Sequence, residues 1–215
     1  SGGHRDTHSC PTAPPSELKK VNDHNGTVVW GASSQGSYGH WPVILQADSD
    51  NEAEVGMVGG GMLGIYDHDG TVIRQVSAGT NQPGPPCVAD LDGDGEAEIA
   101  WPSSNTFNAY ELDGTVMWNH TINDSSGLAG CSAYDIDGDG ASEVLYADQV
   151  AFYIWDGATG TLRYTNTGHT SGTIFEYPTV ADVDNDGNAE ILIASLSGGA
   201  LTGITAFGHN GDGWP

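Results

Sequence analysis

Three short loops in this sequence carry carboxylates at alternate positions, in the pattern D-x-D-x-D-G-x-x-E. Calcium takes six to eight oxygen ligands at about 2.3–2.6 Å and tolerates irregular geometry, so one tight loop of alternating carboxylates can wrap it. The glycine after the third aspartate permits a sharp turn, which would bring the backbone carbonyl of position 7 to the ion. The pattern therefore predicts calcium sites.

The complete loops span residues 90–98, 135–143 and 182–190, and we call them the second, third and fourth acidic loops. The first acidic loop, residues 46–54, aligns with them but has Gln46 at position 1. We therefore predict about three calcium sites and a weak or empty fourth. The candidate ligands are Asp90, Asp92, Asp94, Glu96 and Glu98 in the second loop, Asp135, Asp137, Asp139, Ala141 and Glu143 in the third, Asp182, Asp184, Asp186, Asn188 and Glu190 in the fourth, and Asp48, Asp50 and Glu54 in the first.

An EF-hand and a set of metal-free Asx turns both fit these loops less well. An EF-hand needs its bidentate glutamate at position 12 and a helix on each side, whereas position 12 here is Trp101, Tyr146 or Ile193, in a predicted strand. Asx turns form without any metal, because aspartate and glycine favour turns. Four close carboxylates without a cation would repel one another strongly, however, so the repeated complete sets favour calcium.

The acidic loops recur about every 45 residues, which is the length of a four-stranded propeller blade. A glycine turn followed by β-branched residues also recurs, at residues 24–30, 68–74, 112–118 and 158–164, and suits a tight hairpin. One repeat then contains strands A to D at residues 88–90, 98–101, 107–111 and 115–118. We predict an all-β fold, a β-propeller of about four four-stranded blades with calcium-binding loops between strands A and B.

We expect residues 17–215 to form the propeller and residues 1–16, which are rich in proline, to form a tail. The last blade lacks a clear strand D, because the chain closes with a C-like strand near residues 201–207. If residues 27–30 supply that strand, the ring closes with no exposed sheet edge. The alternatives are a larger ring made of two chains, strand exchange between chains, or a chain cut from a longer repeat region.

Composition and charge exclude several partners. The 29 acidic and 5 basic residues yield a formal net charge of −24, so nucleic acid and anionic membrane surfaces are not expected to bind. No apolar run is long enough to span a membrane, so we expect no membrane insertion. The sequons at Asn25, Asn119 and Asn123 are compatible with a secreted glycoprotein.

The three cysteines, Cys10, Cys87 and Cys131, fit no metal-binding spacing and leave one cysteine unpaired whatever the pairing. One hypothesis is two free buried thiols and a third thiol in the tail. The second hypothesis is a disulfide from Cys10 that fixes the N-terminal segment to an inner strand, which would suit an oxidising compartment.

The chain resembles the FG-GAP and VCBS repeats, of the kind that build the integrin α-chain propeller and many bacterial surface proteins. The resemblance rests on the D-x-D-x-D-G-x-x-E loop that opens strand B, and it covers residues 17–215. It implies calcium in the loop between strands A and B of each blade. The Phe-Gly and Gly-Ala-Pro signatures are mostly missing, with only Phe207-Gly208 present, which favours the broader VCBS type over integrin-like ligand binding.

These observations predict a non-catalytic propeller, extracellular or at the cell surface, that acts in adhesion, interaction or surface structure. Its expected partner is a protein or glycan ligand, and it could also self-associate by strand exchange. We expect no enzyme, because the sequence contains no nucleophile elbow, P-loop or dinucleotide fingerprint. One alternative is a carbohydrate-binding propeller that stacks sugars on Trp30, Trp118 and Tyr164, although such aromatics more often pack between blades. A second alternative is a fragment of a calcium-dependent polysaccharide lyase.

Overall fold

The computed structural model describes residues 19–22, 24–32, 41–77, 83–169, 171–174, 176–197 and 200–208. Within these ranges the secondary structure is entirely β, as predicted. No helix in the described part of the chain could cross a membrane. The predicted tail, residues 1–16, and its Cys10 lie outside the described residues.

The strands form five antiparallel sheets that follow the order of the chain. A two-stranded sheet contains β1 (Lys19–Asn22) and β2 (Val28–Ala32). Blade 1 contains β3 (Trp41–Leu45), β4 (Glu54–Gly59), β5 (Met62–Tyr66) and β6 (Val72–Ser77). Blade 2 contains β7 (Cys87–Ala89), β8 (Glu98–Ser103), β9 (Thr106–Glu111) and β10 (Val116–Thr121). Blade 3 contains β11 (Cys131–Tyr134), β12 (Glu143–Ala147), β13 (Phe152–Trp155) and β14 (Leu162–Asn166). Blade 4 contains β15 (Thr179–Ala181), β16 (Glu190–Ser197) and β17 (Ala200–Phe207).

The predicted strands A to D of one repeat correspond to β7, β8, β9 and β10, with boundaries that differ by at most a few residues. Each acidic loop connects strands A and B of its blade, as predicted. The prediction of about four four-stranded blades is refined, because three of the described sheets have four strands and blade 4 has three.

Apolar clusters between neighbouring blades form the core. In strand B of blade 2, Ile99 and Trp101 pack toward blade 1, while Ala100 packs toward blade 3. Strand B of blade 3 follows the same rule, because Tyr146 packs toward blade 2 and Leu145 toward blade 4. Both faces of strand B are therefore buried, which explains why its sequence is apolar almost throughout.

The strand D side chains also contribute to the contacts between blades. Trp118 Nε1 donates a hydrogen bond of 2.5 Å to the backbone carbonyl of Gly157 in the next blade. Trp30 Nε1 makes the equivalent bond of 2.8 Å to the carbonyl of His68 in blade 1. The recurring strand D tryptophan thus docks each of these sheets onto the following hairpin turn.

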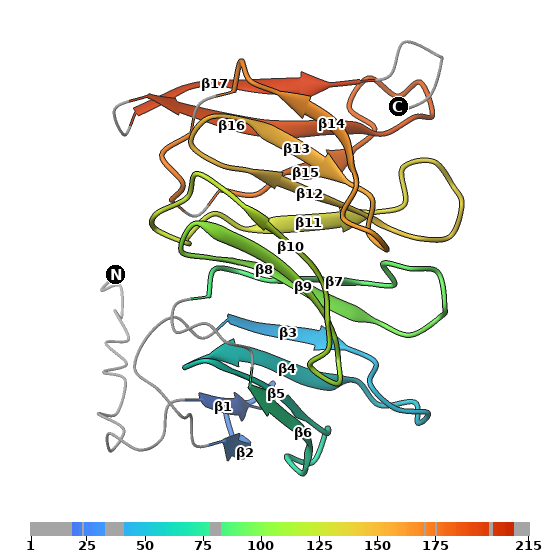
Figure 1. Cartoon of the computed structure of the whole chain (residues 1–215). Helices are drawn as coiled ribbons and strands as arrows, with labels where there is room; N and C mark the ends of the chain where they lie inside the picture. The colour runs from blue at the N-terminus through green and yellow to red at the C-terminus, as the bar shows by residue number, and fades with distance from the viewer. Residues whose placement is uncertain are drawn as a thin grey trace, which may run out of the picture.

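The sheets lie in a row, with β1 and β2 at one end and β17 at the other (Figure 1). The strand of residues 27–30 does not complete blade 4, because β2 pairs with β1 and Trp30 packs on Tyr66 of blade 1, with ring centroids 5.7 Å apart. The hairpin of β1 and β2 therefore serves as strands C and D of a sheet that precedes blade 1. The described residues do not close a ring.

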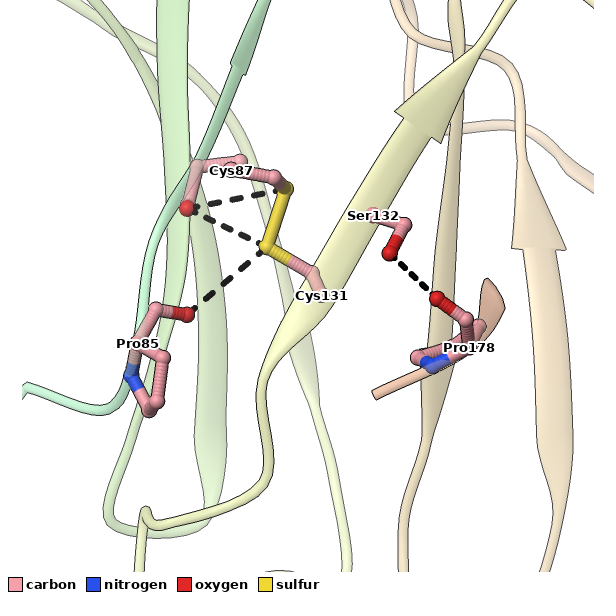
Figure 2. Close-up of a disulfide and its surroundings, with 6 residues drawn as sticks. Pro85, Cys87, Cys131, Ser132 and Pro178 are labelled. Atoms are coloured by element: carbon pink, nitrogen blue, oxygen red, sulfur yellow. Dashed lines mark hydrogen bonds between the residues drawn. A yellow bond between two sulfur atoms is a disulfide. The ribbon is translucent and has the colours of Figure 1, made fainter. Parts of the chain in front are cut away.

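A disulfide joins Cys87 of blade 2 to Cys131 of blade 3 (Figure 2). Both residues lie on strands A, which contact each other across neighbouring blades. The Cα atoms are 5.5 Å apart, which suits a disulfide. Both hypotheses for the cysteines were therefore wrong. Cys87 and Cys131 are not free thiols, and because they bond to each other, neither of them can form a disulfide with Cys10.

Candidate metal sites in the acidic loops

The aspartate at position 1 organises each complete acidic loop. Asp90 Oδ1 accepts a hydrogen bond from the amide of Gly93 at 2.6 Å, and its Oδ2 accepts one from the amide of Gly95 at 2.9 Å. Asp135 and Asp182 accept loop amides with both carboxylate oxygens in the same way. Such Asx contacts are local, so the sequence of the loop is enough to shape it.

The glutamate at position 9 is the buried member of each loop. Glu98 is fully buried, and its Oε2 accepts the amide of Leu91 at 2.6 Å. The glutamates at this position in the remaining loops are also buried and accept the same amide with Oε2, namely Glu54, Glu143 and Glu190. Glu98 Oε1 is buried and has no hydrogen-bond partner. An ionised oxygen in that position is costly unless a cation compensates its charge.

The electrostatics of the second loop lead to the same requirement. Burial raises the pKa of Glu98 to about 7, and the hydrogen bond from Leu91 only partly opposes this effect. The charges of Asp92, Glu111 and Asp94 raise that pKa further. The protein alone therefore holds this carboxylate ion poorly, and a bound cation would favour its charged form.

Each complete loop brings three carboxylate oxygens within 4.8 Å of one another. The groups are Asp90, Asp92 and Asp94 in the second loop, Asp135, Asp137 and Glu143 in the third, and Asp182, Asp184 and Glu190 in the fourth. These all-oxygen donor sets, together with the unpartnered Glu98 Oε1, fit a hard cation such as calcium.

Some predicted side-chain ligands lie outside these groups, namely Glu98 in the second loop, Asp139 in the third and Asp186 in the fourth. Asp139 Oδ1 accepts the amide of Ala141, and Asp186 Oδ1 accepts the amide of Asn188. The aspartate at position 5 therefore also supports the turn. The predicted coordination by the backbone carbonyl of position 7 stays a prediction.

Sequence reasoning missed a cation that the protein itself supplies to the third loop. Arg163 of β14 forms hydrogen-bonded ion pairs with Asp137 Oδ2, at 2.6 Å, and with Glu143 Oε1. These contacts hold the pKa of Asp137 below its usual range. The equivalent strand D positions are Ile73 in blade 1 and Met117 in blade 2. A basic residue at a position that is apolar in these two repeats was the sequence signal for this ion pair.

The first loop has a different donor set from the one predicted. Asp48 and Glu54 are grouped with Asp67, which comes from the turn between β5 and β6. Asp50 is grouped separately with Glu52 and His68. In the sequence, the only indication that Asp67 could join this group was its position as an acidic residue directly after strand C.

The three aromatic residues proposed to stack on sugars do not form one open surface. Trp118 is buried and stacks on Phe107, with ring centroids 5.9 Å apart. Tyr164 packs edge-on against Phe207 of blade 4, at 6.2 Å. Together with the docking of Trp30 on blade 1, these contacts assign the aromatics to the interfaces between blades.

Comparison with known proteins identifies the repeat. A family model described as an FG-GAP-like repeat matches residues 90–146 and 135–193, which contain the second, third and fourth acidic loops. No curated protein sequence matches the chain.

Solved structures agree on the fold. The V. cholerae biofilm matrix protein Bap1 has a TM-score of 0.70 and 14% identity, over 91% of this chain and 60% of that one. The structure of BBS1N in complex with ARL6DN has a TM-score of 0.57 and 9% identity, over 85% of this chain and 60% of that one. The chain thus spans 60% of the length of both structures, and such low identities establish similarity of fold alone. Residues 90–193 therefore contain FG-GAP-like repeats, and the sheets of the described chain are arranged as the blades of a β-propeller fold.

Proposed function

We propose that this chain is a non-catalytic, extracellular propeller module in which calcium fixes the loops between strands A and B. The observation that carries the proposal is Glu98, whose buried Oε1 has no hydrogen-bond partner, in the loop whose Asp90, Asp92 and Asp94 bring three carboxylate oxygens within 4.8 Å of one another. A calcium ion would join strand B to the start of the loop. Repeated in three blades, this bond would hold the ends of the sheets rigid.

Several features support a location outside the cell. Disulfides persist in oxidising compartments, and Cys87–Cys131 joins two blades at a buried position. The strongly negative net charge keeps the module soluble and away from anionic surfaces. The similarity to a biofilm matrix protein is compatible with a role in adhesion or surface structure, with a protein or glycan as ligand.

Self-association is part of this proposal. Among the described residues β17 is the outer strand of blade 4, and its Ile204 is 68% exposed. An edge strand offers unpaired backbone groups to another strand, so a second copy could continue the row of sheets. Light scattering at increasing protein concentration would distinguish monomers from oligomers, and a monomer at all concentrations would remove self-association from the proposal.

The calcium proposal is tested by melting the full chain after treatment with a chelator and again after titration with calcium chloride. Binding to the folded state alone raises the melting temperature in proportion to the logarithm of calcium concentration. Calorimetric titration would count the sites, and magnesium at equal concentration would serve as the control for ionic strength. An unchanged melting temperature together with no heat of binding would rule out the calcium sites.

A further inference from the structure

The first acidic loop has lost the carboxylate at position 1, yet it keeps the shape of the complete loops. Gln46 Nε2 donates hydrogen bonds to the backbone carbonyls of Asp48, at 3.2 Å, and Asp50, at 3.1 Å. Asp50 Oδ1 also accepts the amide of Glu52 at 2.8 Å, as position 5 does in the complete loops. Gln46 therefore holds the loop together by donating to its carbonyls, where the aspartate of a complete loop accepts from its amides, and it brings no charge.

A carboxylate from elsewhere in blade 1 lies beside this loop. Asp67 directly follows β5 and begins the hairpin turn to β6, where its backbone carbonyl accepts the amide of Gly70 at 2.8 Å. The turn holds Asp67 in a half-buried position, and one of its oxygens lies within 4.8 Å of oxygens from Asp48 and Glu54. The blade 1 group therefore has three carboxylates, the same number as the group in each complete loop.

A second observation indicates that this group is incomplete without a ligand. Glu54 is fully buried, its Oε2 accepts the amide of Ala47 at 2.5 Å, and its Oε1 is buried without a hydrogen-bond partner. An ionised oxygen in such a position must be compensated by a cation. Among the described residues, the guanidinium of Arg163 enters the third loop, whereas the basic side chain beside this group is the imidazole of His68, which contacts Asp67.

We propose that the first acidic loop and the turn between β5 and β6 together hold a fourth divalent cation, with Asp67 as the substitute for position 1. The donor atoms of Asp48, Glu54 and Asp67 are all carboxylate oxygens, so the ligand is a hard cation of the calcium class. This inference rests on the calcium chemistry of the proposed function. The new element is that the first acidic loop binds a cation although it lacks the aspartate at position 1, because Asp67 from outside the repeat motif supplies a carboxylate.

The neighbouring imidazole makes a transition metal the competing outcome. His68 Nδ1 lies 2.6 Å from Asp67 Oδ1 and 3.9 Å from Asp50 Oδ2, and His68, Asp50 and Glu52 also form a group in which all three residues are exposed. Zinc or nickel would favour this nitrogen-containing group. The buried Glu54, by contrast, belongs to the oxygen-only group, which is why we assign calcium.

The test is calorimetric titration of the chelator-treated full chain with calcium chloride. We expect about four sites in the unchanged protein and about three in Asp67→Asn, which removes the charge with little change in shape. Asp69→Asn is the matched control, because Asp69 is an exposed acid of the same turn that caps the amide of Thr71 and lies outside the group. It should keep about four sites.

Gln46→Asp provides the rescue. Combined with Asp67→Asn, it restores a carboxylate at position 1 and should restore the lost site. Asp48→Asn, an exposed ligand of the same group, should remove the site as Asp67→Asn does, so the test stands even if one variant fails to fold by circular dichroism.

The outcomes separate this inference from the proposed function. Three sites in both the unchanged protein and Asp67→Asn would overturn the fourth site and leave calcium binding by the complete loops intact. No calcium binding at all would overturn both. If zinc binds instead, and the binding depends on Asp67 but is not matched by calcium, the assigned class of cation is wrong.

Discussion

Cys87 and Cys131 form a covalent bond between the first strands of two neighbouring blades. The next interface uses the same two repeat positions, where the hydroxyl of Ser132 donates a hydrogen bond to the carbonyl of Pro178 (Figure 2). Ser132 aligns with Cys87, and Pro178 aligns with Cys131. One pair of positions therefore joins adjacent blades by a disulfide at one interface and by a hydrogen bond at the next.

Replacing both cysteines of this pair by serine should lower the free energy of unfolding. The disulfide closes a loop with a sequence separation of 44, and the chain-entropy relation for that loop yields about 4 kcal/mol. Denaturant titration of the double variant measures the difference. Cys10→Ser should have no effect on stability, and an equally small effect of the double variant would show that the bond is dispensable.

Gly70 and Gly26 form a matched pair for measuring how tightly a hairpin turn packs on the preceding sheet. Both have positive φ, +89° and +83°, so alanine carries a similar backbone cost of about 1 kcal/mol at either site. A Cβ at Gly70 would lie 2.8 Å from Trp30, whereas one at Gly26 would meet nothing within 4 Å. We expect Gly70→Ala to be the more destabilising by about 1–3 kcal/mol. Equal denaturation midpoints would contradict the tryptophan docking.

Glu98→Gln should have opposite effects with and without calcium. In chelator at a pH above about 7, where Glu98 is ionised, the variant should melt at a higher temperature than the unchanged protein, because it removes a buried charge that no cation compensates, by on the order of 1 kcal/mol. With calcium the ranking should reverse, because a ligand is lost. Glu96→Gln, an exposed acid two residues away, should change neither value. If both variants behave alike, Glu98 is not a calcium ligand.

Arg163→Met should strengthen calcium binding at the third loop. The guanidinium pairs with Asp137 and Glu143, so calcium must displace it or share its oxygens. Methionine is the residue at the equivalent position of blade 2, Met117. We expect roughly a tenfold gain in affinity at one site, and lower stability in chelator.

The control for this gain is Arg74→Met, which makes the same change of charge. Arg74 lies in the cleft of 340 Å³ between blades 1 and 2, beside Glu96, Glu111 and Asp113 rather than in the third loop. If Arg74→Met raises affinity as much as Arg163→Met, the effect is one of net charge alone.

The repeat and its loops could be predicted because they depend on local patterns. Asp90 binds amides within five residues of itself, and the glycine turns join strands that follow one another in the chain. The strands of each blade and the burial of both faces of strand B followed from the same spacing. The burial of Trp118 also agrees with the expectation that such aromatics more often pack between blades than stack on sugars.

The tertiary structure alone decided which distant residues meet. Cys87 reaches Cys131 because neighbouring blades place their strands A side by side, and spacing in the sequence does not reveal that contact. Arg163 enters the third loop across a four-stranded sheet, and Asp67 approaches the first loop because strands A, B and C pair in that order. The sequence by itself determined the calcium motif and the blade, since both arise within a few tens of residues. The disulfide between blades and the charges around each loop depend on sheet pairing and stacking, which are long-range.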